Sequence, residues 1–468
     1  MDADDLCYLS AIELLAKYRG GDVSPVEVTD AVLERIARLD PQINAFVTLT
    51  AERARADALA AEAAYRSGDA VGALSGVPIS IKDLTPTKGI PTKMGSLLYS
   101  DNVPDFDPPF VERVYAAGAV MLGKTTTPEF GWKGESSNRV NGPTHNPWKH
   151  GLTAGGSSGG AAAAVAAGFG PLAQGSDGAG SIRIPAGFCG VFGLKPSFGL
   201  VTYYPPSPME VLSHLGPLTR TVRDAALLLN VTVGQDPRDR NSFDTGIDYL
   251  AACDGDAAGL RVAWSSDLGY APVDPEVRAI TTAAVHRLSD LGWHVEEAHP
   301  DADDPWDIVD TLWAAGQANR HRENFAQVRD RIDPGRIPII ERGMSLRAVD
   351  VMDALARRHD YYDRVRVFME RYDLFVTPQL PVTAFPVGHD HPGTVDGHPT
   401  TYLGWTAFTY PFNLTGHPAA TIPVGFASNG LPVCLQFVGK WRADATVLRA
   451  AAAFEAAFPW ADKRPPLG

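Results

Sequence analysis

The sequence lacks several features that define whole classes of protein. It has 41 Lys and Arg against 55 Asp and Glu, a net charge of -14, and no basic run interleaved with aromatic residues. Nucleic acids and anionic membranes bind clustered positive charge, so neither is expected as a partner. No stretch approaches the roughly 18 apolar residues of a membrane span. The acidic start MDADDLCYLS lacks the basic residues of a signal peptide, and we therefore expect a cytoplasmic protein.

Cysteine and metal-binding patterns are also scarce. The sequence has four cysteines, far apart and without a C-x-x-C pair: Cys7, Cys189, Cys253 and Cys434. This usage favours buried, reduced thiols over disulfides. His389 and His391 stand among glycine and proline with no carboxylate-rich helix nearby, which indicates an exposed loop rather than a metal site.

Hydrophobic periodicity indicates helices alternating with strands. Ser24 and Glu27 form a capping box, and the apolar residues that follow have helical spacing. Alternating β-branched residues in VPISIKD predict a strand that ends at Lys82. Further helices are expected over residues 51–65, 109–117, 275–291 and 443–457. Further strands are expected over residues 119–125, 259–266, 293–298, 373–378, 419–426 and 432–439.

This alternation predicts one α/β domain. Its centre is expected to be a large mixed, mostly parallel β-sheet covered by helices on both faces. Residues 1–70 supply N-terminal helices, and residues 373–468 supply C-terminal strands and a helix. Residues 234–372 are less glycine-rich and more charged than their flanks, which predicts a variable subregion that shapes the substrate pocket.

Two glycine-serine loops lie within residues 153–187, TAGGSSGGAAAAVAAGFGPLAQGSDGAGSIRIPAG. They could simply allow the alanine-rich helix between them to pack closely. A phosphate cradle is disfavoured, because neither a P-loop lysine nor G-x-G-x-x-G is present. GGSSG also fits a nucleophile elbow on Ser157, with His391, His398 or His417 as the base. That turn needs a strand directly before it, and WKHGLTA has no β-branched run.

Another interpretation joins both loops to Lys82. A serine nucleophile needs a base, and a lysine whose charged form is disfavoured by burial can act as one. A second serine between them can relay the proton. The run Gly178, Ala179, Gly180 and Ser181 lacks bulky side chains. Its backbone N–H groups can therefore converge on one oxygen as an oxyanion hole.

Several long motifs resemble the amidase signature family of serine hydrolases. They are GVPISIKDL, GAVMLGKTTTPEF, HNPW, GGSSGGAAAAVAAG, GSDGAGSIRIPAGFCGVFGLKPS and GPLTRTVRDAALLL, all within a core of residues 74–230. The resemblance implies a Ser–cis-Ser–Lys catalytic unit: Lys82 is the base, Ser157 the relay after a cis peptide bond, and Ser181 the nucleophile. It also implies a single α/β domain that needs neither a metal nor an organic cofactor.

The resemblance extends to neighbouring residues. It implies oxyanion donors at Gly178, Ala179, Gly180 and Ser181, although Ala179 stands where many members have glycine. Gly131 and Trp132 match a stretch that lines the acyl pocket in the family. Asp177 and Arg183, beside the predicted nucleophile, are expected to brace the loop rather than to take part in the reaction. The aromatic run YLGWTAFTYPF at residues 402–412 is expected to pack in the core.

The implied function is hydrolysis of the C–N bond of small, apolar or aryl amides through an acyl-enzyme on Ser181. Carbamates (urethanes) and esters are possible further substrates. One alternative is an α/β-hydrolase-type esterase that uses Ser157 and a histidine, and another is a catalytically silent binding protein with an amidase-like fold. The only partner expected is a small-molecule amide or carbamate substrate, with no nucleic acid and no membrane, and the protein is expected to be a monomer or a homodimer.

Overall fold

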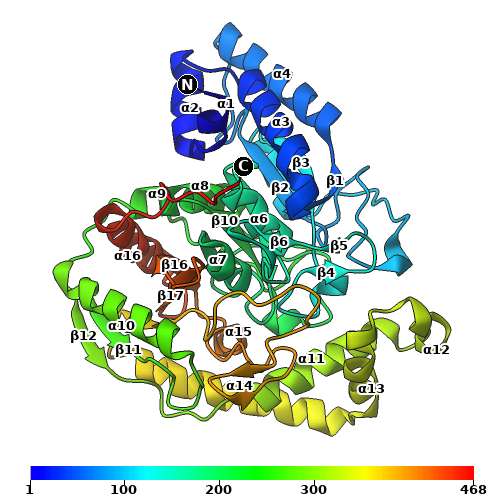
Figure 1. Cartoon of the computed structure of the whole chain (residues 1–468), viewed down its shortest axis with the longest axis vertical. Helices are drawn as coiled ribbons and strands as arrows, with labels where there is room; N and C mark the ends of the chain where they lie inside the picture. The colour runs from blue at the N-terminus through cyan, green and yellow to red at the C-terminus, as the bar shows by residue number, and fades with distance from the viewer. Residues whose placement is uncertain (1, 468) are drawn as a thin grey trace.

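An eleven-stranded mixed β-sheet forms the centre of the computed structural model, which describes residues 2–467 (Figure 1). In order across the sheet the strands are β1 (Phe46–Leu49), β3 (Val120–Thr125), β2 (Pro78–Lys82), β8 (Leu172–Asp177), β10 (His214–Thr219), β9 (Phe192–Lys195), β16 (Ala419–Phe426), β17 (Pro432–Gly439), β13 (Leu374–Pro378), β11 (Arg261–Trp264) and β12 (His294–Glu297). Three small hairpins lie outside it: β4 (Ser137–Asn138) with β5 (Gly142–Pro143), β6 (His145–Asn146) with β7 (Lys149–Thr153), and β14 (Thr394–Val395) with β15 (His398–Pro399).

The strand directions divide the sheet into zones. β2 is parallel to β3 and β8, and β11 is parallel to β12 and β13. The consecutive pairs from β8 through β10, β9, β16 and β17 to β13 are antiparallel, and so is β1 on β3. The expected large mixed sheet is present, and the register refines the expectation of mostly parallel pairing: the parallel pairs form two groups around an antiparallel centre.

Helices cover both faces of the sheet. They are α1 (Ala3–Cys7), α2 (Ala11–Gly20), α3 (Pro25–Ile43), α4 (Ala51–Ser67), α5 (Pro109–Ala116), α6 (Gly159–Ala166), α7 (Arg183–Cys189), α8 (Val222–Thr232), α9 (Tyr249–Ala252), α10 (Pro275–Asp290), α11 (Trp306–His321), α12 (Phe325–Val328), α13 (Ile337–Ser345), α14 (Ala348–Met369), α15 (Tyr410–Thr415) and α16 (Asp444–Ala457). Helices α1–α4 lie at the top of Figure 1, and α11–α14 lie at the opposite end.

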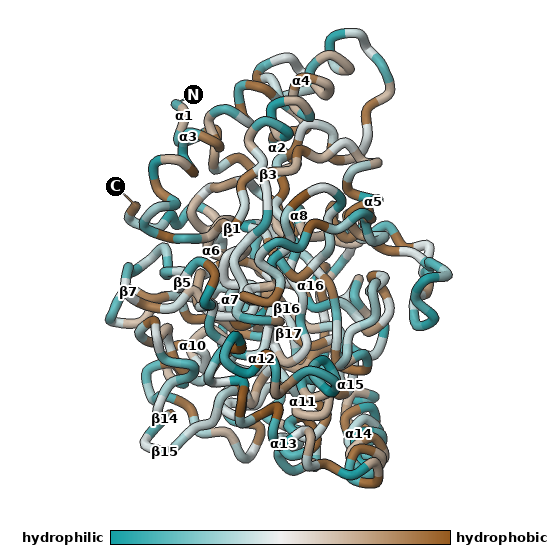
Figure 2. Tube along the Cα trace, turned by 90° about the vertical axis from the view of Figure 1, so that its right-hand side faces the viewer, coloured by the Kyte–Doolittle hydropathy of each residue, from teal (hydrophilic) through white to brown (hydrophobic). Residues whose placement is uncertain are grey.

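The predicted helices and strands are all present. Helix α3 begins at Pro25, and Ser24 and Glu27 form the predicted capping box. The segment of residues 234–372 contributes β11 and β12 to the main sheet and adds helices α11–α14, which the periodicity did not reveal. Hydrophobic residues lie along central segments such as β16 and β17, whereas the segment around α12 is hydrophilic (Figure 2).

The composition-based expectations can be compared with the same structure. All four cysteines are free and buried, as predicted. Within residues 2–467, no helix has the length and apolar character needed to cross a membrane. The same residues contain no cluster of three His, Cys, Asp or Glu side chains arranged to hold a metal ion.

Candidate active site

The pairing of β2 with β8 sets the position of Lys82. The two strands are parallel, so their carboxyl ends lie at the same edge of the sheet. Ile79 and Ile81 pack into an apolar core cluster that also contains residues of α8 and α16. Side chains alternate along a strand, so Lys82 points to the opposite face, beside the start of α6.

Lys82 is fully buried and contacts two hydroxyl groups. Its Nζ lies 2.6 Å from Ser157 Oγ and 3.0 Å from Ser176 Oγ. Lys82 belongs to none of the ion pairs formed by residues 2–467. Burial lowers the pKa of Lys82 well below its usual value, and the carboxylate of Asp177 only partly opposes this effect. The surroundings therefore favour the neutral amine, which carries a lone pair.

The first glycine-serine loop brings Ser157 to Lys82. The Gly156–Ser157 peptide bond is cis. A Cβ atom on Gly156 would lie 2.6 Å from the backbone nitrogen of Glu135, so only glycine permits this close approach. The next residue, Ser158, directs its Oγ to the backbone of Ser176. The loop therefore serves close packing as well as placing one serine beside the lysine.

The second loop is built on a buried ion pair. Asp177, at the end of β8, and Arg183, at the start of α7, are both fully buried, and Arg183 Nε lies 3.0 Å from Asp177 Oδ2. Burial alone would raise the pKa of Asp177, but the Arg183 guanidinium outweighs it and holds that pKa below the usual range. Asn413 also donates to the Asp177 carboxylate. These two residues brace the loop, as expected from the sequence.

One of the four backbone N–H groups predicted to stabilise an oxyanion has another partner in the structure. The backbone N–H of Gly180 donates to Asp177 Oδ1 at 2.6 Å and is therefore already occupied. The hydrogen bonds of residues 2–467 include no acceptor for the N–H groups of Gly178, Ala179 or Ser181. The Asp177 carboxylate thus accepts from one of the four predicted donors and leaves three N–H groups to bind an oxyanion.

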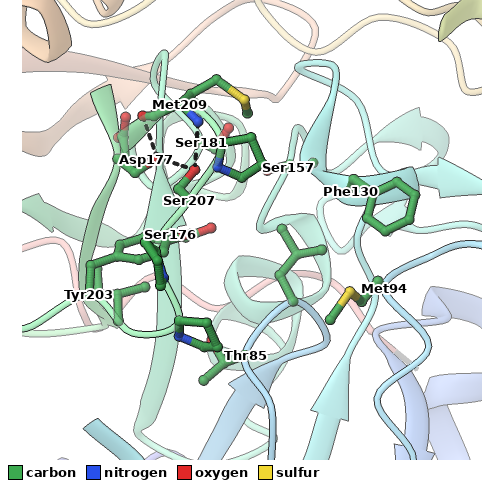
Figure 3. A pocket seen from close by; sticks show the side chains of 18 of the residues that line it. Thr85, Met94, Phe130, Ser157, Ser176, Asp177, Ser181, Tyr203, Ser207 and Met209 are labelled. Carbon is green, nitrogen blue, oxygen red and sulfur yellow. Dashed lines mark hydrogen bonds between the residues drawn. The ribbon is translucent and has the colours of Figure 1, made fainter. Parts of the chain in front are cut away.

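Ser157 and Ser181 line one cavity, together with Ser176, Asp177 and Gly178 (Figure 3). Its empty volume, including the part open to solvent, is about 950 Å³. The hydrogen bonds of residues 2–467 do not include one between the side chains of the two serines. The structure therefore places the predicted relay and nucleophile on one cavity wall, and the predicted base behind the relay in direct hydrogen-bond contact with it.

The two residues predicted to line the acyl pocket differ in position. Gly131 lines the cavity, and a Cβ atom added to it would lie 2.9 Å from Ser157 Oγ. Trp132 is buried outside the cavity and packs against Tyr402, with ring centroids 6.2 Å apart, so this part of the prediction is wrong. The reason is a tight turn in which Phe130 has a φ of 52°, and Phe130 rather than Trp132 faces the cavity.

Sequence reasoning missed the cavity residues contributed by distant segments. Trp313 and Arg320 come from α11, and Tyr203, Ser207 and Met209 come from the loop before β10. None of these residues belongs to a recognisable motif. Only the helical spacing of Trp313 and Arg320, seven residues apart, could have placed those two on one face of a helix.

The histidine-based alternative finds no support in this geometry. His391, His398 and His417 are absent from the residues that line the cavity. A strand, β7, does precede Ser157, contrary to expectation, but it pairs with β6 in a separate hairpin rather than in the main sheet. The aromatic residues of the 402–412 run pack in the core as expected: Tyr402, Trp405, Phe408, Tyr410 and Phe412.

This fold and this cavity have counterparts among known proteins. A family model described as Amidase matches residues 27–448, and the chain belongs to that family. An acylamidase of Rhodococcus erythropolis is 42% identical over 99% of this chain and 98% of its own length. A glutamyl-tRNA(Gln) amidotransferase subunit of Moorella thermoacetica is 37% identical over 99% of both chains.

Solved structures agree with the family assignment. A bacterial aryl acylamidase of the amidase signature family superimposes with a TM-score of 0.92 at 31% identity, covering 97% of both chains. The structure of 6-aminohexanoate cyclic dimer hydrolase complexed with substrate gives a TM-score of 0.90 at 30% identity, covering 98% of this chain and 99% of that one. The resemblance read from the motifs is therefore confirmed, and the chain is an amidase that hydrolyses amide C–N bonds.

Proposed function

We propose that the chain hydrolyses small, apolar or aryl amides through an acyl-enzyme on Ser181, with Lys82 as the base and Ser157 as the proton relay. The observation that carries this proposal is the 2.6 Å contact between Lys82 Nζ and Ser157 Oγ. This contact is buried, involves no ion pair with a carboxylate of the described residues, and lies beside a cavity that Ser157 and Ser181 line.

The proton relay begins at Lys82. A neutral amine has two N–H groups and one lone pair. One N–H can donate to Ser176 Oγ, which leaves the lone pair to accept the proton of Ser157. Ser157 in turn removes the proton of Ser181 as Ser181 Oγ attacks the amide carbonyl carbon. This geometry supplies general-base catalysis without a histidine.

The later steps reuse the same groups. The N–H groups of Gly178, Ala179 and Ser181 stabilise the oxyanion of the tetrahedral intermediate, and loss of one such donor typically costs about 10²–10³ in rate. The relay then runs in reverse and delivers a proton to the leaving amine, so that the C–N bond breaks. Water enters by the same route and hydrolyses the ester on Ser181, which frees the carboxylic acid.

The cavity wall supports the proposed substrate class. Much of the lining is apolar, from Leu84, Met94, Phe130, Met209 and Trp313. Such a wall favours an aliphatic or aromatic group by burial of apolar surface. The similarity to an acylamidase and to an aryl acylamidase points the same way. Carbamates and esters remain candidate substrates, because acyl transfer to Ser181 would cleave them by the same steps.

A fluorophosphonate probe tests the assignment of the nucleophile. The wild-type protein should be phosphonylated at Ser181, located by mass spectrometry of the labelled peptide, and should hydrolyse anilides in a panel of amides, carbamates and esters. Ser181→Ala should abolish both labelling and turnover. Ser158→Ala is the matched control, since among residues 2–467 the Ser158 hydroxyl hydrogen-bonds only with the Ser176 backbone, and this variant should still be labelled. Labelling at Ser157 would favour the esterase alternative, and absence of labelling would favour a silent binding protein.

A further inference from the structure

Helix α11 forms part of the cavity wall. Trp313 and Arg320 of this helix both line the cavity. Trp313 lies beside the predicted oxyanion donors, because a Cβ atom on Gly178 would be 3.0 Å from its ring. Seven residues along an α-helix span two turns and about 10 Å on one face. The helix therefore separates the Cα atoms of Trp313 and Arg320 by about 10 Å along its axis.

Arg320 forms no ion pair with any carboxylate of residues 2–467. Its Cζ lies 4.3 Å from the ring centroid of Phe130, yet Arg320 takes part in no ion pair and no hydrogen bond among residues 2–467. A second arginine, Arg336, lies 4.8 Å from the same ring. Arg336 pairs with Glu129 at 2.8 Å and also donates to Gln317. Of these two cations on one aromatic ring, only Arg336 has a carboxylate partner.

This arrangement leaves unused binding capacity in the cavity. A guanidinium offers five N–H donors in a planar fork that matches a carboxylate. Burial, followed by the like charge of Arg336, lowers the pKa of Arg320, which shows that its surroundings disfavour the charged form. An anion at this position would offset that disadvantage. Hydroxyl groups of Tyr203, Ser207 and Ser213 line the same cavity and can hydrogen-bond the same ligand.

We propose that Arg320 binds a carboxylate group of the substrate, so that the preferred amides carry an anionic group separated from the scissile C–N bond by an apolar spacer. The spacer would lie along the apolar lining formed by Met209, Trp313 and Phe130. This inference rests on the proposed function and narrows its substrate class. It assigns Arg320 as a specificity-determining residue and gives it no part in bond cleavage.

Two series of chromogenic anilides test this inference. The first contains p-nitroanilides of dicarboxylic acids of increasing length, each compared with the alkanoyl p-nitroanilide in which a methyl group replaces the terminal carboxylate. The second contains 4-acylaminobenzoates, each compared with the matching 4-acylaminotoluene. In at least one series the wild-type enzyme should prefer the carboxylate by kcat/KM. Arg320→Met should reduce that preference by about 10- to 100-fold, mainly through KM, because a hydrogen bond to a charged group has this magnitude.

Matched variants separate recognition from general damage. Arg322→Met removes one positive charge from the exposed end of the same helix and should retain the wild-type preference, because Arg322 is absent from the cavity lining. Arg320→Lys keeps the charge but loses the planar fork and should fall between Arg320→Met and the wild type. Fluorophosphonate labelling of Ser181 and the thermal unfolding temperature report whether each variant is folded.

A binding measurement keeps this inference separate from the proposed function. Calorimetry with Ser181→Ala should show the carboxylate ligand binding about 10- to 100-fold tighter than its neutral partner. Adding Arg320→Met should remove the difference. If no amide is hydrolysed but this difference is found, the proposed function fails and the anion site stands. If neutral amides are hydrolysed and neither series nor calorimetry shows a preference that depends on Arg320, the inference is overturned.

Discussion

Replacement of Lys82 by Met should reveal its protonation state through the pH dependence of stability. The lysine is fully buried, and burial lowers its pKa well below the usual value. In the unfolded chain the amine has its ordinary pKa of about 10.4. Between the two pKa values, unfolding therefore takes up one proton.

The sign and the size of the effect follow from proton linkage. Where the unfolded state binds more protons, the free energy of unfolding rises with pH. Lys82 should contribute a rise of up to about 1.4 kcal/mol per pH unit in this window. The destabilisation of the folded state by Lys82 reaches its full size below the pKa that Lys82 has in the folded state, and it disappears near pH 10.4. Lys82→Met lacks this contribution. The free energy of unfolding of the variant minus that of the wild type should therefore fall with increasing pH, at the same slope. The hydrogen bonds lost to Ser157 and Ser176 shift this difference by an amount that does not depend on pH.

The assay is denaturant unfolding at several pH values from 7 to 10, followed through the fluorescence of the nine tryptophans. Other buried lysines are present in both proteins, so their contributions cancel in the difference. Lys149→Met, which removes an exposed lysine on β7, controls for the loss of one positive charge. The same Lys82→Met variant should lose about 10²–10⁴ in turnover, the usual contribution of a general base. A difference in stability that stays flat with pH would show that the buried amine keeps its proton, and the neutral-base mechanism would be refuted.

Two further predictions concern residues around the serines. Gly131→Ala places a methyl group 2.9 Å from Ser157 Oγ at a φ of 74°, so kcat/KM should fall about 10²-fold, as misplaced catalytic groups typically cause. Trp132→Phe is the control, because Trp132 lies outside the cavity. An unchanged kcat/KM for Gly131→Ala would contradict the geometry. Arg183→Met leaves the buried Asp177 carboxylate without its cation and should lower the free energy of unfolding by about 3–5 kcal/mol. Denaturant unfolding measures this loss, and a loss below about 1 kcal/mol would show that the pair does not brace the loop.

Much of the site could be predicted from residue types in order along the chain. The glycine-serine loops, the lysine at the end of a strand and the family motifs predict Lys82, Ser157 and Ser181 as the catalytic residues. The structure places the two serines at one cavity and Lys82 in contact with Ser157. Trp132 was misassigned because a turn at Phe130 reverses which side chain faces inward. Backbone turns of this kind depend on packing against distant elements, so the local sequence does not reveal them.

The hydrogen bonds within the site show the same limit. The sequence suggested four oxyanion donors, yet the Asp177 carboxylate takes the N–H of Gly180. Whether a backbone N–H is free depends on where one acceptor side chain settles. Arg320 is a similar case, because no motif marks it and its proposed role depends on its place beside Phe130 without an ion-pair partner in the described part of the chain.

The sequence by itself determined the local elements and the identities of the reactive groups. Helix caps, strand alternation and glycine loops depend on interactions among residues a few positions apart, and such patterns can be read directly from the chain. The tertiary structure alone decided that Lys82 is buried without an ion pair among residues 2–467, which serines contact it, and that Arg320 faces the cavity. These properties depend on contacts between distant parts of the chain, such as the one between Lys82 and Ser157, which are separated by 75 positions. They depend also on the loss of water that only the folded core imposes.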